Sequence, residues 1–179
     1  GRRLGIVAID PTSPFSGGAI LGDRIRMNEL TGDPGIFIRS MATRGALGGL
    51  ARTTLDAVDI LDAAGFDVVL IETVGVGQDE IEVVQAAHTI VVVSAPGLGD
   101  DIQAIKAGVL EIADIHAVSK CDRVDAARTI ADLKNMLRLN ATPTQSSAWQ
   151  LPVVATSAET GEGMDRLLEQ IDAHLGFLK

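Results

Sequence analysis

The stretch Ile112-Ala113-Asp114-Ile115-His116-Ala117-Val118-Ser119-Lys120-Cys121-Asp122 decides the fold class of this chain. Its apolar first half, residues 112–118, predicts a buried strand. Residues 123–139 carry apolar side chains at helical spacing and predict a helix. An apolar strand that leads directly into a helix is typical of a parallel sheet covered on both faces.

The same alternation of strands and helices runs through the rest of the chain. Apolar runs predict strands at residues 4–9, 36–38, 68–71, 89–93 and 153–155, and periodic runs predict helices at 50–64 and 164–175. We therefore expect an α/β fold in which residues 1–179 form a single domain. Its sheet is expected to be doubly wound and mainly parallel, with helices on both faces. Such sheets bind ligands at the carboxyl ends of their strands.

Lys120 and Asp122 lie at one of these strand ends, in a Lys-x-Asp pattern. An aspartate there can accept hydrogen bonds from the ring N–H and the exocyclic amine of guanine. Adenine lacks this pair of donors, so a site built for both bonds rejects it. In most loops Lys-x-Asp is only solvated charge. Here a second half supports it, because Thr156-Ser157-Ala158-Glu159 follows the next predicted strand and its backbone N–H groups can reach the guanine carbonyl.

Composition excludes several classes of partner. A chain of 179 residues with 46% apolar residues is large enough to bury a core. Its net charge of −9 argues against nucleic acid, and its apolar runs are too short to cross a membrane. A single cysteine, Cys121, suits a reducing cytosol. We expect a cytoplasmic protein.

Further polar residues suggest a phosphate and metal side. Glu72 follows a predicted strand, and Gly75 lies three residues later in the run Glu72-Thr73-Val74-Gly75-Val76-Gly77-Gln78. A carboxylate at a strand end can hold Mg²⁺, and a glycine N–H can approach a γ-phosphate. Asp10 and Asp23 are further candidate metal ligands. Each feature alone also fits an ordinary glycine-rich turn or a surface loop.

One expected motif is absent. A nucleoside triphosphatase of this fold cradles phosphates with Gly-x-x-x-x-Gly-Lys-Ser/Thr, and this sequence contains no such run. We therefore expect that the chain is incomplete at its N-terminal side, where the first strand and the phosphate loop would lie.

Taken together, these motifs resemble the MeaB/ArgK-type GTPases, relatives of the human methylmalonic aciduria type A protein. The resemblance covers nearly the whole chain and rests on residues 9–14, 16–24, 26–27, 38–40, 44–49, 72–80 and 99–108. It implies a P-loop GTPase fold, GTP or GDP and Mg²⁺ as ligands, and typically a homodimer. It also implies GTP hydrolysis that gates the loading and protection of an adenosylcobalamin-dependent acyl-CoA mutase, usually methylmalonyl-CoA mutase.

The resemblance also implies roles for single residues. It assigns catalysis to Glu72, Gly75 and Gln78, and metal binding to Asp10, Asp23 and Glu72. Nucleotide binding goes to Lys120, Asp122, Ser157, Ala158 and Glu159, and coupling to the mutase goes to Asp101, Gln103 and Lys106. One departure is Ser119, where the family usually has an asparagine that ties the base loop to the phosphate loop.

Alternatives remain open at this point. The chain could be a non-hydrolysing interaction module, or a GTPase domain cut from a fused mutase. An amino-acid transport ATPase is disfavoured by Asp122, because ATP lacks the required donor pair. A nickel metallochaperone GTPase is disfavoured because Cys121 is alone and the three histidines are far apart in sequence.

Overall fold

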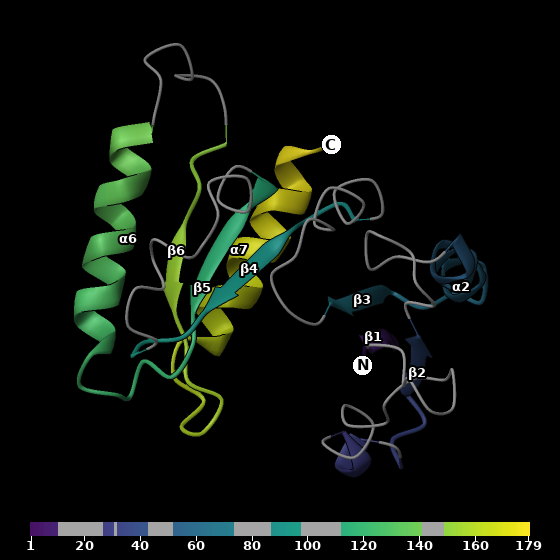
Figure 1. The fold of residues 1–179 in the computed structure, drawn as a ribbon. Coiled ribbons are helices and arrows are strands. Elements are labelled where there is room, and N and C mark those ends of the chain that lie inside the picture. Colours follow the sequence, from purple (N-terminus) through teal and green to yellow (C-terminus); the bar gives the residue numbers. More distant parts are fainter. Residues whose placement is uncertain (11–26, 31, 43–51, 74–86, 98–111, 141–148) are drawn as a thin grey trace. The chain divides into compact units, whose positions relative to one another are not determined.

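The computed structural model describes residues 1–10, 27–30, 32–42, 52–73, 87–97, 112–140 and 149–179 (Figure 1). Contacts divide the chain into two units, Gly1–Ala87 and His88–Lys179, and each is described by itself. The elements are β1 (Leu4–Asp10), η1 (Asn28–Leu30), β2 (Ile36–Ala42), α2 (Arg52–Ala63), β3 (Val68–Thr73), β4 (Val91–Ser94), β5 (Ile115–Val118), α6 (Ala126–Asn140), β6 (Val153–Ala155) and α7 (Met164–Phe177). The expected single domain over residues 1–179 stays a prediction.

The first unit is a parallel sheet with a helix packed on it. Its strand order is β2-β1-β3, and Leu4 at the start of the central strand lies opposite Ile36 and Val68. Helix α2 packs on this sheet through the buried Leu61. A Cβ added at Gly5 would lie 3.0 Å from Leu61 Cδ1, so the glycine permits this close approach of helix and strand.

Arg3 ties the end of α2 to the start of β1. Its guanidinium donates to the carbonyl oxygen of Ala64 at 2.9 Å and lies 4.3 Å from the ring centre of Phe66. Its backbone N–H donates to the Asp67 carboxylate at 2.6 Å. A cation at this position also compensates the negative end of the helix dipole.

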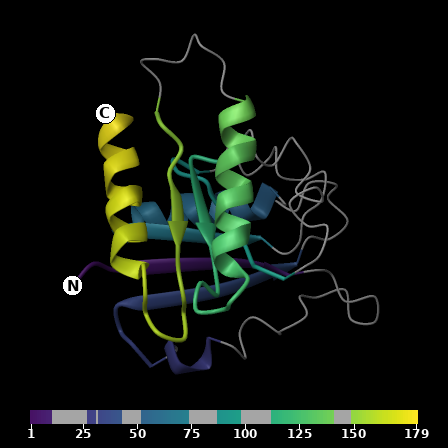
Figure 2. The same cartoon turned by 90° about the vertical axis from the view of Figure 1, so that its left-hand side faces the viewer.

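The second unit is a parallel sheet covered on both faces. The strand order is β4-β5-β6, and all four residues of the central strand β5 are buried. Helices α6 and α7 lie on opposite sides of this sheet (Figure 2). Val118 of β5 and Leu133 of α6 form the core cluster beneath α6. This arrangement is the sandwich that continuous apolar strands require.

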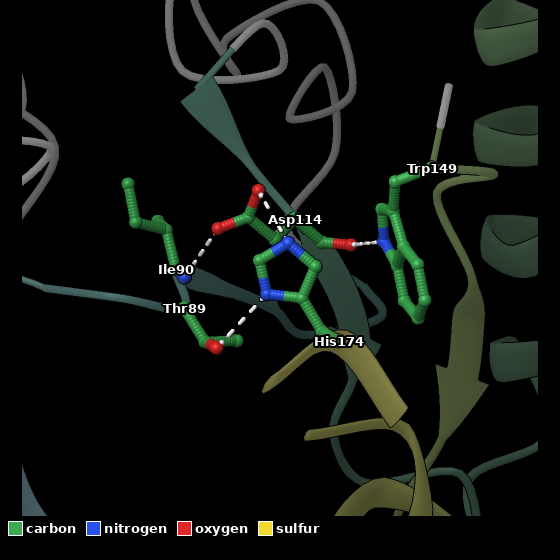
Figure 3. Close-up of polar contacts among 5 residues, drawn as sticks. All are labelled: Thr89, Ile90, Asp114, Trp149 and His174. Carbon is green, nitrogen blue, oxygen red and sulfur yellow. Dashed lines mark hydrogen bonds and ion pairs between the residues drawn. The ribbon is translucent and has the colours of Figure 1, made fainter. Parts of the chain in front are cut away.

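A buried polar network joins α7 to the amino ends of β4 and β5 (Figure 3). His174 of α7 is 3% exposed, and its two ring nitrogens lie 2.9 Å from Thr89 Oγ1 and 3.3 Å from an Asp114 carboxylate oxygen. The other oxygen of that carboxylate accepts the Ile90 N–H at 2.8 Å. Trp149 Nε1–H donates to the Asp114 carbonyl at 2.7 Å. The network uses the amino ends of the strands and leaves their carboxyl ends available.

Several element boundaries differ from the predictions. β2 continues to Ala42, four residues past its predicted end, and β4 begins at Val91, two residues after its predicted start. β5 begins at Ile115 and not at residue 112, because Asp114 turns its carboxylate to the Ile90 N–H. β3 continues to Thr73, so Glu72 lies within the strand and does not follow it. α6 begins at Ala126, three residues after the predicted start, because residues 123–125 form a turn.

His116 lies in the middle of β5 and is completely buried. Neither of its ring nitrogens has a hydrogen-bond partner among the described residues. Burial lowers the pKa of His116 to about 4, so the ring is neutral at physiological pH.

Across the described ranges, no helix is long and apolar enough to span a membrane.

Candidate functional site

Two loops meet at the carboxyl end of the second sheet. One follows β5 and contains Lys120, and the other follows β6 and contains Ser157. Val118 and Ala155 pair at the ends of these strands. Beyond them, the Thr156 N–H donates to the Val118 carbonyl at 2.8 Å, and the Cys121 N–H donates to the Thr156 carbonyl at 3.0 Å. The ladder therefore continues past both strands and holds the two predicted base-reading segments side by side.

Asp122 carries the carboxylate of this site. The hydroxyl of the buried Ser157 is the largest cause that lowers the pKa of Asp122, because it favours the ionised carboxylate. The backbone N–H of Asp122 lowers it further, and the nearby Arg123 and Lys120 act in the same direction. The carboxylate is exposed. It is thus an ionised hydrogen-bond acceptor that faces solvent, with the Ser157 hydroxyl nearby.

Ser157 contributes its hydroxyl, whereas the sequence predicted a role for its backbone N–H. That N–H donates to the Glu162 carbonyl at 2.9 Å and is therefore already used. The Ser157 hydroxyl oxygen also accepts the Thr160 N–H at 3.3 Å. Ala158 is exposed, and its N–H has no acceptor among the described residues. Of the N–H groups in the predicted segment, those of Thr156 and Ser157 are used, and those of Ala158 and Glu159 have no acceptor among the described residues.

Gly163 packs against the backbone of the second loop. Its φ of 73° lies in the left-handed region, and α7 begins at the next residue. A Cβ at this position would lie 1.9 Å from the carbonyl oxygen of Ala155. Only a residue without a side chain allows this approach. Sequence reasoning missed Gly163, although Gly161-Glu162-Gly163 was a visible signal for a tight turn.

Lys120 adopts a left-handed backbone with φ 53°, the only non-glycine residue to do so in the described part of the chain. Its carbonyl accepts the Arg123 N–H at 3.1 Å, which closes a turn around Asp122. The side chain is exposed.

Cys121 lies between these two residues and is partly buried. Partial burial raises the pKa of its thiol, and the carboxylates of Glu162 and Asp122 raise it further. The thiol is therefore protonated at neutral pH and is a poor nucleophile. It does not offer a reactive group.

The predicted phosphate and metal side belongs to the first unit. Glu72 is exposed on β3 and lies beside Ala8 in the register of β1 and β3. Asp10 is the last residue of β1, two positions beyond Ala8. Carboxylate oxygens are the ligands that Mg²⁺ prefers, so the residue types at these neighbouring strand ends fit that ion. No group of three or more potential metal ligands occurs in the ranges that the structure describes.

Several predicted residues lie outside the described residues. They are Asp23, Gly75 and Gln78 on the phosphate side and Asp101, Gln103 and Lys106 on the partner side. Glu159 is described and lies exposed in the turn after Ala158. In the second unit, Lys120, Asp122 and Ser157 lie close together, and Ala158 and Glu159 follow Ser157 in the same loop.

Known proteins resemble this chain over all or nearly all of its length. A Pyrococcus horikoshii protein that is named only provisionally as a GTPase is 53% identical over 179 residues, which are 100% of this chain and 56% of that protein. The mouse mitochondrial methylmalonic aciduria type A homolog is 41% identical over 170 residues, or 93% of this chain and 40% of that protein. The chain spans about half the length of these relatives.

Solved structures agree with the predicted fold. The crystal structure of an LAO/AO transport system kinase matches with a TM-score of 0.73 and 26% identity, over 98% of this chain and 50% of that one. The prediction of a parallel α/β fold of the P-loop GTPase type is confirmed. The sequence profile of the family described as methylmalonyl Co-A mutase-associated GTPase MeaB matches residues 1–179, and the chain belongs to this family.

Proposed function

We propose that this protein binds and hydrolyses GTP and thereby gates the cofactor loading and protection of an adenosylcobalamin-dependent acyl-CoA mutase of the methylmalonyl-CoA mutase type. Membership of the family supports the GTPase assignment and the mutase as partner. The observation that carries the nucleotide part is the exposed Asp122 carboxylate, whose pKa is lowered chiefly by Ser157, at the junction of two strand-end loops.

Guanine selectivity follows from the donors and acceptors at this junction. Asp122 would accept hydrogen bonds from the ring N–H and the exocyclic amine, and the Ala158 N–H would donate to the base carbonyl. Adenine would bring an unprotonated ring nitrogen to the carboxylate and an amine to the Ala158 N–H. The first contact would place two hydrogen-bond acceptors together, and the second would place two donors together. A site that leaves polar groups unpaired in this way discriminates strongly against adenine. Lys120 and Glu159 would flank the base.

The phosphate side would act mainly through charge. Glu72 and Asp10, with Asp23, would hold Mg²⁺, which supplies positive charge to the β- and γ-phosphates as negative charge develops there. Gly75 would donate its N–H to the γ-phosphate and Gln78 would orient the attacking water. GTP hydrolysis of this kind depends on the positioning of the reacting groups and on electrostatic stabilisation. It therefore requires every group of the phosphate site, and it is to be measured in the full-length gene product.

Nucleotide state would be transmitted to the partner through residues 97–106. Asp101, Gln103 and Lys106 are the residues that we assign to this coupling. The active species would be a homodimer bound to the mutase. Loops ordered by a γ-phosphate and released after hydrolysis are a common way to convert nucleotide state into a change of partner affinity.

Asp122→Asn in the full-length gene product tests the guanine assignment. An asparagine amide can donate to the second carbonyl of xanthine, so the variant should exchange its preference from GDP to xanthosine diphosphate. Competition against a fluorescent diphosphate in Mg²⁺ measures both affinities. Asp165→Asn, an exposed carboxylate in the first turn of α7 outside both loops, is the matched control. Equal affinity of wild type for GDP and ADP, or an unchanged preference in Asp122→Asn, contradicts the assignment.

Coupling to the mutase needs a separate measurement. The transfer of adenosylcobalamin to purified apo-mutase is followed in the presence of GTP, of GDP and of a non-hydrolysable GTP analogue. The proposal expects transfer to depend on which nucleotide is bound, and expects Lys106→Ala to weaken that dependence. Tight binding to the mutase that ignores nucleotide would favour the interaction module.

A further inference from the structure

The end of β4 touches the base-reading loop at two places. Ser94, the last residue of β4, accepts two hydrogen bonds from Ser119, one from its N–H at 2.7 Å and one from its hydroxyl at 2.9 Å. The N–H bond continues the ladder between β4 and β5. The hydrogen bond from the Ser119 hydroxyl is additional, and it restrains Ser119, which directly precedes the left-handed Lys120.

The second contact lies three residues further along. Gly97 has a φ of 87°, and a Cβ there would lie 2.6 Å from Asp125 Oδ2 and 3.0 Å from an Arg123 guanidinium nitrogen. The backbone of Gly97 therefore lies directly against the ion pair between Arg123 Nε and Asp125 Oδ1, which measures 3.4 Å. A larger residue at position 97 would push this ion pair outward.

The Arg123–Asp125 ion pair affects what the neighbouring Asp122 carboxylate can bind. Arg123 follows Asp122 directly, and its N–H closes the turn onto the Lys120 carbonyl. A guanidinium is a strong bidentate partner for any carboxylate within reach. If Arg123 paired with Asp122, it would occupy the oxygens that are needed for the base. In the structure the guanidinium is paired with Asp125, and an open hollow lined by residues 122–125 lies beside it.

We propose that residues 94–97 and Asp125 are positioning elements of guanine recognition. Ser94 fixes the start of the loop through the Ser119 hydroxyl. Because Gly97 has no side chain, it leaves space for the Arg123–Asp125 ion pair. This pair keeps the Arg123 guanidinium from binding the Asp122 carboxylate. The inference rests on the proposed function and extends it to residues that do not contact the base. It also gives Ser119 a role that differs from the one an asparagine has at this position.

The discriminating readout is the ratio of the affinities for GDP and inosine diphosphate. Inosine diphosphate lacks the exocyclic amine, so the ratio reports one of the two bonds to Asp122. In the full-length gene product, Ser119→Ala should lower this ratio by roughly two- to tenfold, the value of one hydrogen bond. Ser119→Thr retains a hydroxyl and should restore the ratio.

A second set of variants tests the ion pair. Asp125→Asn should lower the ratio by roughly two- to fivefold, because exposed pairs are weak. Adding Arg123→Ala to Asp125→Asn should restore it, since no guanidinium is then left to compete for Asp122. Thr89→Val is the matched control. It removes a hydroxyl hydrogen bond before the other end of β4, and it should lower stability without changing the ratio.

The outcomes separate the inference from the proposed function. If wild type prefers neither GDP over ADP nor GDP over inosine diphosphate, the proposed function and this inference fall together. If wild type discriminates, and Ser119→Ala and Asp125→Asn discriminate equally well, the positioning inference alone is overturned. The same holds if the Arg123→Ala addition fails to restore the ratio in Asp125→Asn.

Discussion

Gly163→Ala should destabilise the protein far more than the neighbouring Gly161→Ala. Both glycines have left-handed backbones, with φ of 73° and 78°, in the same turn before α7. An alanine in that region costs roughly 1–2 kcal/mol. Its effect on the unfolded chain is the same at both positions and cancels in the comparison. The two variants therefore differ only in what the new methyl group meets.

The surroundings of the two positions are opposite. At Gly161 a Cβ would meet nothing within 4 Å, whereas at Gly163 it would lie 1.9 Å from the Ala155 carbonyl oxygen. The backbone must move by about 1 Å to reach even the shortest separations that real Cβ atoms show. Overpacking of this kind costs about 1–3 kcal/mol. We expect losses of roughly 2–5 kcal/mol for Gly163→Ala and about 1–2 kcal/mol for Gly161→Ala.

Urea denaturation of the full-length gene product measures both losses. The displaced Ala155 immediately precedes Thr156 and Ser157, so Gly163→Ala should also weaken GDP binding, while Gly161→Ala should leave it closer to wild type. Hydrogen exchange at the Ser157 amide provides a local readout, because its bond to Glu162 spans the turn. Equal destabilisation by the two variants would show that the turn absorbs the methyl group, and the argument from close approach would be wrong.

Three further predictions concern stability. Burial lowers the pKa of His116 from 6.5 to about 4, so its neutral form contributes stability that is complete above pH 6.5. As the pH falls toward 4 the unfolded chain binds the proton first, and stability should decrease by about 3 kcal/mol. His116→Leu should flatten this dependence in urea midpoints measured at pH 7.5 and 5, and an unchanged slope would exclude His116 as its source. Gly176→Ala in α7, where a Cβ meets nothing within 4 Å, should raise stability by up to about 1 kcal/mol, seen as a higher Tm. Trp149→Phe should lose about 1 kcal/mol, the value of the bond to the Asp114 carbonyl; no change in Tm would mean that water replaces the indole donor.

The sequence predicted the order of elements well because apolar runs and helical spacing report burial directly. β1, α2 and α7 were found with boundaries within about three residues of those observed. Glu72 was placed after β3 because polarity was taken as the end of the strand, whereas exposed residues at the edge of a sheet can remain in the ladder. The start of β5 was placed too early because Ile112 and Ala113 are apolar and at least partly buried, although neither belongs to the strand.

The proximity of the two base-reading loops was also predictable, since parallel strands end at the same edge of a sheet. Which backbone or side-chain groups of these loops make each hydrogen bond was not predictable. Whether Ser157 uses its N–H or its hydroxyl depends on the carbonyl of Glu162, which a turn brings back onto it. His174 and Thr89 meet across 85 positions of sequence. Contacts of this kind leave no periodic signal, because they depend on the three-dimensional path of the chain.

The left-handed backbone at Lys120 has a consequence for how this loop can change during evolution. Few side chains tolerate that conformation, and asparagine is among the most tolerant after glycine. Lysine and asparagine codons differ by one base, so the substitution Lys120→Asn can arise in a single mutational step. Such a substitution would relieve backbone strain while removing the amine. The resulting protein would fold, accumulate and pass cellular quality control, and its defect would be visible only in ligand binding.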